Sequence, residues 1–410
     1  MKRIRSLRQI ALLVHRYVGL FIAVFLTVAG FTGSLIAFND ELYSALSPAL
    51  HKARPHATDA QPIHPLVLRE RLLATMAPGA RIGYLPLHVE PERAVRFFVE
   101  RDKDDDTRDN EFFVDPYSGK LLGSRHYGDI RQGLKNLMPL LYQLHYSLAL
   151  ERVGSVLFGA VALLWTLDCF IGAYLTLPPP AKSAATRRRG AWLKRWRQAW
   201  VIRAQSFFAL LFTWHRATGL WLWAMLLVFA WSAVGLNLQE VYIPVMRLAF
   251  GSASVADRLP ILAKPRPEPS LAWDVALTKG RVLMAREASV QHVSVIHETA
   301  LRYFPRYGAY RYQVRSTADI SEHYPRTSVW FDAQTGKLLA FDAPTGQHAA
   351  TTANTWLLAL HFGDLAGGGL AYRVFVMLMG VLVALLSVSG VLIWLRKTKR
   401  RPAKAAVDGS

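Results

Sequence analysis

Four long apolar runs alternate with polar segments along the chain: Tyr17–Phe38, Val153–Leu177, Phe207–Leu236 and Leu370–Leu395. An α-helix needs about 20 apolar residues to cross the hydrocarbon core of a bilayer, and each run is long enough. The pattern predicts an α-helical membrane protein with four transmembrane helices.

Two long stretches between the apolar runs, residues 39–140 and 237–355, have the periodicities of folded domains. Apolar residues recur at helical spacing in 62–76 and again in 271–284. Short segments rich in branched and aromatic residues predict strands at 94–99, 111–114, 293–296, 310–314 and 328–331. The stretches therefore predict two small α+β domains outside the membrane.

The two halves of the chain repeat each other. Val14–Leu20 (VHRYVGL) returns as Trp214–Leu220 (WHRATGL), and Asp115–Leu122 (DPYSGKLL) returns as Asp332–Leu339 (DAQTGKLL). This is a tandem duplication of helix, external domain and helix. The predicted segments are 1–38 (N-terminal segment and first helix), 39–140 (first external domain), 141–177 (second helix), 178–206 (basic linker), 207–236 (third helix), 237–355 (second external domain), 356–396 (fourth helix) and 397–410 (tail).

The positions of the charged residues predict the orientation of the chain in the membrane. The 410 residues carry a formal net charge of +20, a value also found among nucleic-acid-binding proteins. Here, however, the basic residues flank the apolar runs, which is typical of the cytoplasmic side of membrane proteins. They are Lys2, Arg3, Arg5, Arg8, Arg187, Arg188, Arg189, Lys194, Arg195, Arg197, Arg396, Lys397, Lys399, Arg400 and Arg401. We therefore expect both termini in the cytoplasm, contact with membrane lipid and no nucleic-acid partner.

The first apolar run has a signal peptide as its alternative interpretation. The run is too long for one, and no small-residue cleavage site follows it. The single cysteine, Cys169, lies within the second run and is expected to be a small buried apolar residue. The external domains accordingly contain no disulfide.

Each predicted membrane helix has one histidine near an end. His15 and His215 lie at the cytoplasmic ends of the first and third helices, and His145 and His361 precede the second and fourth. A neutral imidazole is a common axial ligand of haem iron, and two ligands of one iron must lie at one depth. The sequence thus predicts two haem b groups, one held by His15 with His215 and the other by His145 with His361.

Residues beside the inner pair fit this hypothesis. Gly19 and Gly219 lie one helical turn after His15 and His215, where the lack of a side chain leaves room for a macrocycle. Arg16 and Arg216 are expected at the aqueous rim, in reach of haem propionates. Helix packing explains such glycines equally, and topology alone explains such arginines.

The outer pair precedes its apolar runs by several residues, so we expect the second haem close to the external surface. Three tryptophans of the basic linker, Trp192, Trp196 and Trp200, stand four apart and suit a helix lying in the inner headgroup layer. A docking surface for a soluble electron donor is the alternative.

Two segments of the predicted external domains can be interpreted either as binding sites or as plain protein surface. Residues 102–109 form an acidic run, either a solvated hairpin tip or a cation site. An aromatic and basic cluster is either a soluble domain's surface or a contact for a metal chelate; it comprises Arg302, Tyr303, Arg306, Tyr307 and Tyr310. No zinc spacing such as HExxH, phosphate loop or dinucleotide fingerprint occurs in a suitable context.

Together, the HRxxGL motifs, the histidines before the returning helices and the Gly-Lys-Leu-Leu turns resemble the PepSY-associated transmembrane family, from Leu12 to Arg396. Val14 and Trp214 stand where the family often has leucine. The resemblance implies two periplasmic PepSY-like domains, two haem b groups and a bacterial inner membrane. It also implies reduction of a ferric siderophore in the periplasm, with electrons from a cytoplasmic or quinol donor.

Two other functions stay open at this point. One is di-haem electron transfer to a different periplasmic acceptor or to quinone. The other is a membrane-anchored PepSY binding or regulatory protein without redox chemistry. The four matched histidines favour the redox functions, because a regulatory protein needs no such set of haem ligands.

Overall fold

The computed structural model describes residues 6–55, 57, 60–101, 109–179, 189–251 and 259–399. It divides into two compact units, each built from both halves of the duplication. The helical unit comprises Met1–Ala37, Tyr142–Pro244 and Arg373–Ser410. The sheet-containing unit comprises Phe38–Leu141 and Val245–Tyr372.

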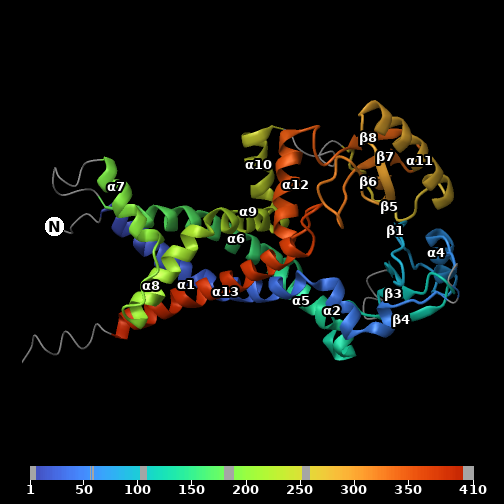
Figure 1. Cartoon of the computed structure of the whole chain (residues 1–410). Coiled ribbons are helices and arrows are strands. Elements are labelled where there is room, and N and C mark those ends of the chain that lie inside the picture. The colour runs from blue at the N-terminus through green and yellow to red at the C-terminus, as the bar shows by residue number, and fades with distance from the viewer. Residues whose placement is uncertain are drawn as a thin grey trace, which may run out of the picture. The chain divides into compact units, whose positions relative to one another are not determined.

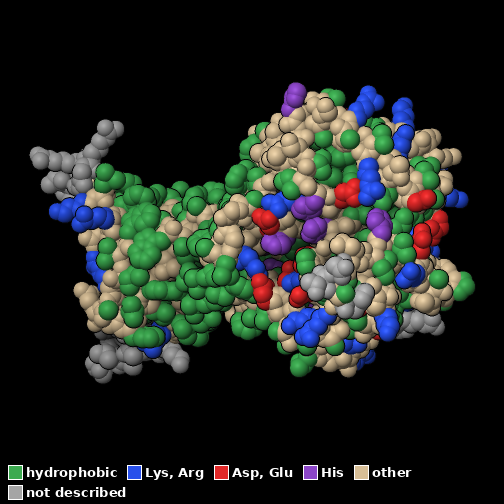
Figure 2. Space-filling view, turned by 45° about the vertical axis from the view of Figure 1, so that its right-hand side comes forward, with side chains coloured by type: hydrophobic (Ala, Val, Ile, Leu, Met, Phe, Trp, Pro, Cys, Tyr) green, Lys and Arg blue, Asp and Glu red, His purple; other side chains and the backbone are tan. Residues whose placement is uncertain are grey.

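Three helices of the helical unit are long and apolar enough to cross a membrane: α1 (Leu7–Ile36), α6 (Glu151–Thr176) and α13 (Gly369–Lys399). A capping box starts α1, because Ser6 accepts from the backbone of Gln9 while the Gln9 side chain accepts from Ser6. In Figure 1, α6 runs beside α1 and α9 (Trp223–Asn237), and these pairs are packed. Hydrophobic side chains cover the face of this unit seen in Figure 2, as lipid contact requires.

The third predicted helix is broken. The structure has α8 (Phe207–Trp221) and α9, joined at Leu222 and bent by 70°. Gly219 lies three residues before the break, and glycine is a poor helix former. A continuous helix over 207–236 was therefore a wrong prediction. Within the described residues there are three candidate spans, or four if the bent pair counts as one.

Glycine permits a close contact between α1 and α13. A Cβ at Gly30 on α1 would lie 2.5 Å from the Gly380 carbonyl oxygen on α13. The Ser34 hydroxyl donates to the Met377 carbonyl at 2.9 Å, across the same crossing. Small residues let membrane helices approach in this way.

The linker between the repeats forms a short helix, α7 (Arg189–Trp196), followed by a 3₁₀ turn, η5 (Arg197–Trp200). Its three tryptophans form a row, with ring centroids 5.6 Å apart for Trp192 and Trp196 and 5.4 Å for Trp196 and Trp200. The predicted helical row of tryptophans is thus present.

In the sheet-containing unit, a strand from the first external loop joins a sheet from the second. β1 (Tyr84–Pro86) pairs antiparallel with β5 (Val295–Phe304), and the order is β1-β5-β6-β7-β8. The further strands of this sheet are β6 (Ala309–Ser316), β7 (Ser328–Asp332) and β8 (Leu338–Asp342). A second sheet has the order β2-β3-β4, with β2 (Val95–Phe98), β3 (Glu111–Val114) and β4 (Leu121–Arg125).

The helices α4 (Pro65–Ala74) and α11 (Trp273–Val290) fall where the two amphipathic segments were predicted. One hydrophobic core contains side chains from both loops, including Phe97, Leu301 and Phe331. The two external loops therefore fold as one unit rather than as two separate cores. The remaining helices are α2 (Asn39–Leu46), α3 (Pro48–His51), η2 (Ile130–Gln132), η3 (Leu134–Asn136), α5 (Leu137–Ser147), α10 (Gln239–Phe250) and α12 (Ala349–Phe362).

The duplicated turn has the same geometry in both loops. The Asp115 carboxylate accepts from the Tyr117 backbone at 2.8 Å, and Gly119 has a φ of 72°. The Asp332 carboxylate accepts from Thr335 at 2.7 Å, and Gly336 has a φ of 69°. Glycine adopts this left-handed conformation without steric cost, which explains why both copies contain it.

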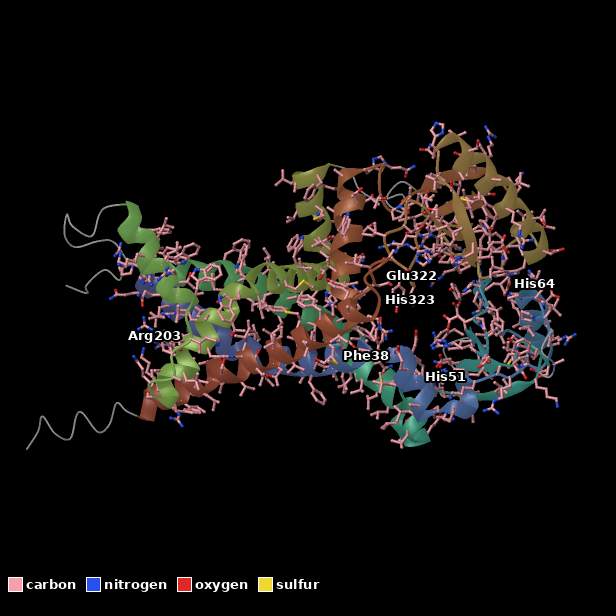
Figure 3. The ribbon with its side chains drawn as sticks, in the orientation of Figure 1. Phe38, His51, His64, Arg203, Glu322 and His323 are labelled. Carbon is pink, nitrogen blue, oxygen red and sulfur yellow. The ribbon has the colours of Figure 1, made fainter. Side chains whose placement is uncertain are left out.

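A loop carboxylate organises the segment before β7. Asp364 accepts from the Glu322, His323 and Tyr324 backbones, and from Nδ1 of His323 at 2.9 Å. Figure 3 labels Glu322 and His323 in this segment. The hydrogen bond to Asp364 raises the pKa of His323 above its ordinary 6.5. Burial would raise the pKa of Asp364, but the hydrogen bonds from His323 hold it below 3.8.

We expect substitution of Gly380 by valine to lower the stability of the helical unit. Because an added Cβ would lie 2.6 Å from the Gly30 carbonyl oxygen, the cost should be about 1–3 kcal/mol, as for other overpacked sites. Thermal unfolding in detergent measures it. Val381→Leu, at a position 42% exposed on the same helix, is the control, and an equal effect of both variants would contradict the packing argument.

The His323–Asp364 pair should stabilise the protein in a window of pH. A raised histidine pKa gives stability that is present below 6.5 and lost as pH rises through the folded value. A lowered aspartate pKa gives stability that is present above 3.8 and lost at lower pH. His323→Gln should thus lower the unfolding temperature more at pH 5.5 than at pH 8.5, and equal losses at both would refute the ion pair.

Candidate functional site

His15 of α1 is anchored by a carboxylate of α6. Its Nδ1 lies 2.9 and 3.0 Å from the two carboxylate oxygens of Asp168. The side chain of Asp168 is 9% exposed and that of His15 is 31% exposed. An ionised carboxylate only accepts, so this contact calls for a proton on Nδ1 and leaves Nε2 as the ring atom that can bind a metal.

His215 of α8 is anchored in the same way by α13. Its Nδ1 lies 2.8 Å from the Ser389 hydroxyl and 3.2 Å from the Leu386 carbonyl oxygen. The carbonyl only accepts, so Nδ1 again carries the proton. Among the described residues, Nε2 of neither histidine has a hydrogen-bond partner.

The structure brings the two rings of the predicted inner pair together. The centroids of His15 and His215 lie 6.3 Å apart, and the ring planes are tilted by 59°. An imidazole nitrogen binds a transition metal at about 2 Å, so two rings on opposite sides of one ion have centres about 6 Å apart. The separation therefore suits one metal ion between the rings.

Glycines shape the space on both sides of this pair. A Cβ at Gly172 of α6 would lie 3.5 Å from Cε1 of His15, and one at Gly390 of α13 would lie 3.4 Å from Cε1 of His215. By contrast, a Cβ at Gly19 or Gly219 would meet no atom within 4 Å. Open space thus lies beside the backbone one turn from each histidine.

His145 of α5 has the same kind of anchor on α1. Its Nδ1 lies 3.0 Å from the Ala29 carbonyl oxygen and 3.2 Å from the Thr32 hydroxyl. A Cβ at Gly33 would come within 2.8 Å of Cε1 of its ring, so glycine is needed there. His361 lies on α12 in the other compact unit, and the pairing of His145 with His361 stays a prediction.

The basic ends of the helices meet at one end of the helical unit. Arg8 at the start of α1 donates to the carbonyls of Leu175 and Leu177 at the end of α6, at 2.7 and 2.9 Å. Arg396 near the end of α13 lies over the ring of Phe207 at the start of α8, 4.2 Å from its centroid. His15 and His215 lie two to three turns from this end.

The sequence of this chain matches a known protein family over most of its length. The chain matches the PepSY-associated TM region over residues 12–397. The chain belongs to the PepSY-associated transmembrane family. No curated protein matches it.

In this PepSY-associated transmembrane protein, the two predicted propionate arginines have different surroundings. Arg216 donates to the Gln198 and Ala199 carbonyls at 2.6 and 3.2 Å, which ties η5 to α8. Arg16 has no hydrogen bond or ion pair within the parts of the chain that the structure describes. A role for either with propionates stays a prediction.

Asp168 and Ser389 were not among the predicted site residues. An aspartate within an apolar membrane run is a recognisable signal, since a charge there is costly. Ser389 had no such signal, because serine is ordinary in membrane helices. Cys169, beside Asp168, is buried as expected.

Two external predictions have different outcomes. Tyr303 and Tyr310 are core residues, 4% and 0% exposed, and their hydroxyls donate to the carbonyls of Arg266 and Leu271. Both predicted interpretations, a surface position and contact with a chelate, are therefore wrong for these two tyrosines. The acidic run falls on residues 102–108, outside the described residues, apart from Asp109, which accepts from Ser124 and Gln132.

Proposed function

We propose that this membrane protein is a di-haem b oxidoreductase that carries electrons across a bacterial inner membrane to a ferric siderophore in the periplasm. The observation that carries the proposal is the inner histidine pair, with ring centroids 6.3 Å apart. Among the described residues, no cluster of three His, Cys, Asp or Glu side chains is placed to hold a metal ion. Haem needs only two axial ligands from the protein.

The residues around the pair fit a haem. Asp168 and Ser389 fix the tautomer in which Nε2 is the ligand atom, as second-sphere partners of metal-bound histidines do. Gly19 and Gly219 leave the space that a macrocycle fills. A bound haem supplies one-electron chemistry between ferric and ferrous iron, and the protein binds, orients and shields it.

The proposed direction is from the cytoplasm outward. Basic residues gather at the end of the helical unit where Arg8 and Arg396 lie, which supports a cytoplasmic location for this end and for both termini. The inner pair lies near it, so a quinol or a soluble donor at this side delivers electrons there. The pair His145 and His361 is proposed to hold the second haem, nearer the periplasm.

The proposed substrate follows from the family resemblance and from iron chemistry. Each ferric ion takes up one electron and becomes ferrous, while the siderophore itself is not oxidised. Hard oxygen ligands hold the ferrous ion less tightly than the ferric ion, so reduction releases the metal. A quinol that gives up two electrons and two protons would serve two ferric ions.

We expect the purified protein to contain two b-type haems per chain. His15→Ala and His215→Ala should each leave about one, because each variant removes one of the two axial ligands proposed for that site, and His145→Ala and His361→Ala should do the same for the other site. Optical spectra of the oxidised and dithionite-reduced protein, with haem and protein quantified together, measure this.

His88→Ala is the matched control, since this histidine is exposed in the sheet-containing unit and stacks on His297. It should retain both haems. A colourless protein from cells well supplied with haem would contradict the proposal and favour a membrane-anchored binding protein.

A further inference from the structure

A carboxylate is buried among apolar helices beside only one of the two inner histidines. Both carboxylate oxygens of Asp168 point at Nδ1 of His15, at 2.9 and 3.0 Å. Among the described residues, His15 is its one ion-pair partner. A charge at such a position is costly, and a protein retains one where it has a function.

The duplication shows that helix packing does not require this carboxylate. Gly172 and Gly390 contact the two histidine rings in the same manner, at 3.5 and 3.4 Å. Four residues before Gly172 stands Asp168, and four residues before Gly390 stands Leu386. In the second copy a leucine carbonyl and the Ser389 hydroxyl meet the ring instead, so neutral acceptors suffice to orient a histidine there.

A neutral and a charged hydrogen-bond acceptor at Nδ1 have different effects on a histidine that binds a metal. Either one fixes the tautomer and the direction of the ring. Only the carboxylate adds a negative charge next to the ligand, which makes the imidazole more electron-donating. Such a charge stabilises ferric over ferrous iron, and second-sphere hydrogen bonding is a known means of tuning haem potentials.

We propose that Asp168 is a positioning residue that acts through His15 to lower the reduction potential of the inner iron centre. This inference rests on the proposed function. The Nδ1 of His145 contacts two neutral groups instead, the Ala29 carbonyl oxygen and the Thr32 hydroxyl. A haem held by His15 and His215 would supply one-electron chemistry, and the charge of Asp168 beside His15 would favour loss of that electron from the ferrous state.

Asp168→Asn separates charge from orientation, because asparagine keeps an oxygen acceptor at the same place. A potentiometric titration of the purified full-length protein, followed optically, resolves the two couples. We expect the lower couple to move upward by at least tenfold in its reduction equilibrium, or about 59 mV for one electron. The other couple should stay within a few-fold of its original value.

Ser389→Ala is the matched control, since it removes a neutral acceptor from His215 and leaves the Leu386 carbonyl. In this variant the reduction equilibrium of the lower couple should shift by less than tenfold. Unchanged couples in Asp168→Asn, or an equal shift in Ser389→Ala, would overturn the assignment of the effect to the charge.

Asp168→Glu covers the case in which Asp168→Asn loses a haem or does not fold. Glutamate keeps the charge, so the reduction equilibrium of the lower couple should stay within a few-fold of its original value. A tenfold upward shift of this equilibrium would overturn the inference. Haem content of the unsubstituted protein tests the proposed function separately, because a protein without haem refutes that proposal and shows no couples at all.

Discussion

The hydrogen bond from Nδ1 of a histidine to a neighbouring helix is the interaction on which the candidate site depends. His15, His215 and His145 each make one, to Asp168 of α6, to the Leu386 carbonyl of α13 and to the Ala29 carbonyl of α1 respectively. In each case an acceptor that cannot donate, a carboxylate or a backbone carbonyl, fixes the proton on Nδ1. The same bonds tie the helices together, so the geometry of the bundle and the direction of the ligand atoms are set by the same contacts.

Small residues make these bonds possible. A histidine ring fits between two helices only where the facing residue has little or no side chain, and Gly172, Gly390 and Gly33 occupy these positions. The packing of α1 against α13 at Gly30 and Gly380 follows the same rule without a histidine. Glycines in this bundle thus have three roles: close helix contact, seating of a ring, and open space at Gly19 and Gly219.

Much of this arrangement could be predicted from local sequence. Apolar runs indicated α1, α6 and α13, the repeated Gly-Lys motifs indicated two matching turns, and the HRxxGL repeats indicated the pair His15 and His215. Features that depend on distant residues could not be predicted. The pairing of β1 with β5 joins loops about two hundred residues apart, and strand partners leave no local signal. The break at Leu222 has no proline to mark it, and Gly219 alone is a weak local signal because glycines are common in membrane helices. Asp168 did carry a signal, but its partner could only be known from the fold.

The central claim is that two imidazoles ligate one haem iron between α1 and α8. Low-temperature electron paramagnetic resonance of the oxidised, purified protein tests it most directly, because the spin state of ferric haem reports its axial ligands. The account predicts low-spin ferric signals typical of two imidazoles, one of which is lost in His215→Ala. High-spin signals as the main species in the unsubstituted protein, or no haem signal at all, would contradict it.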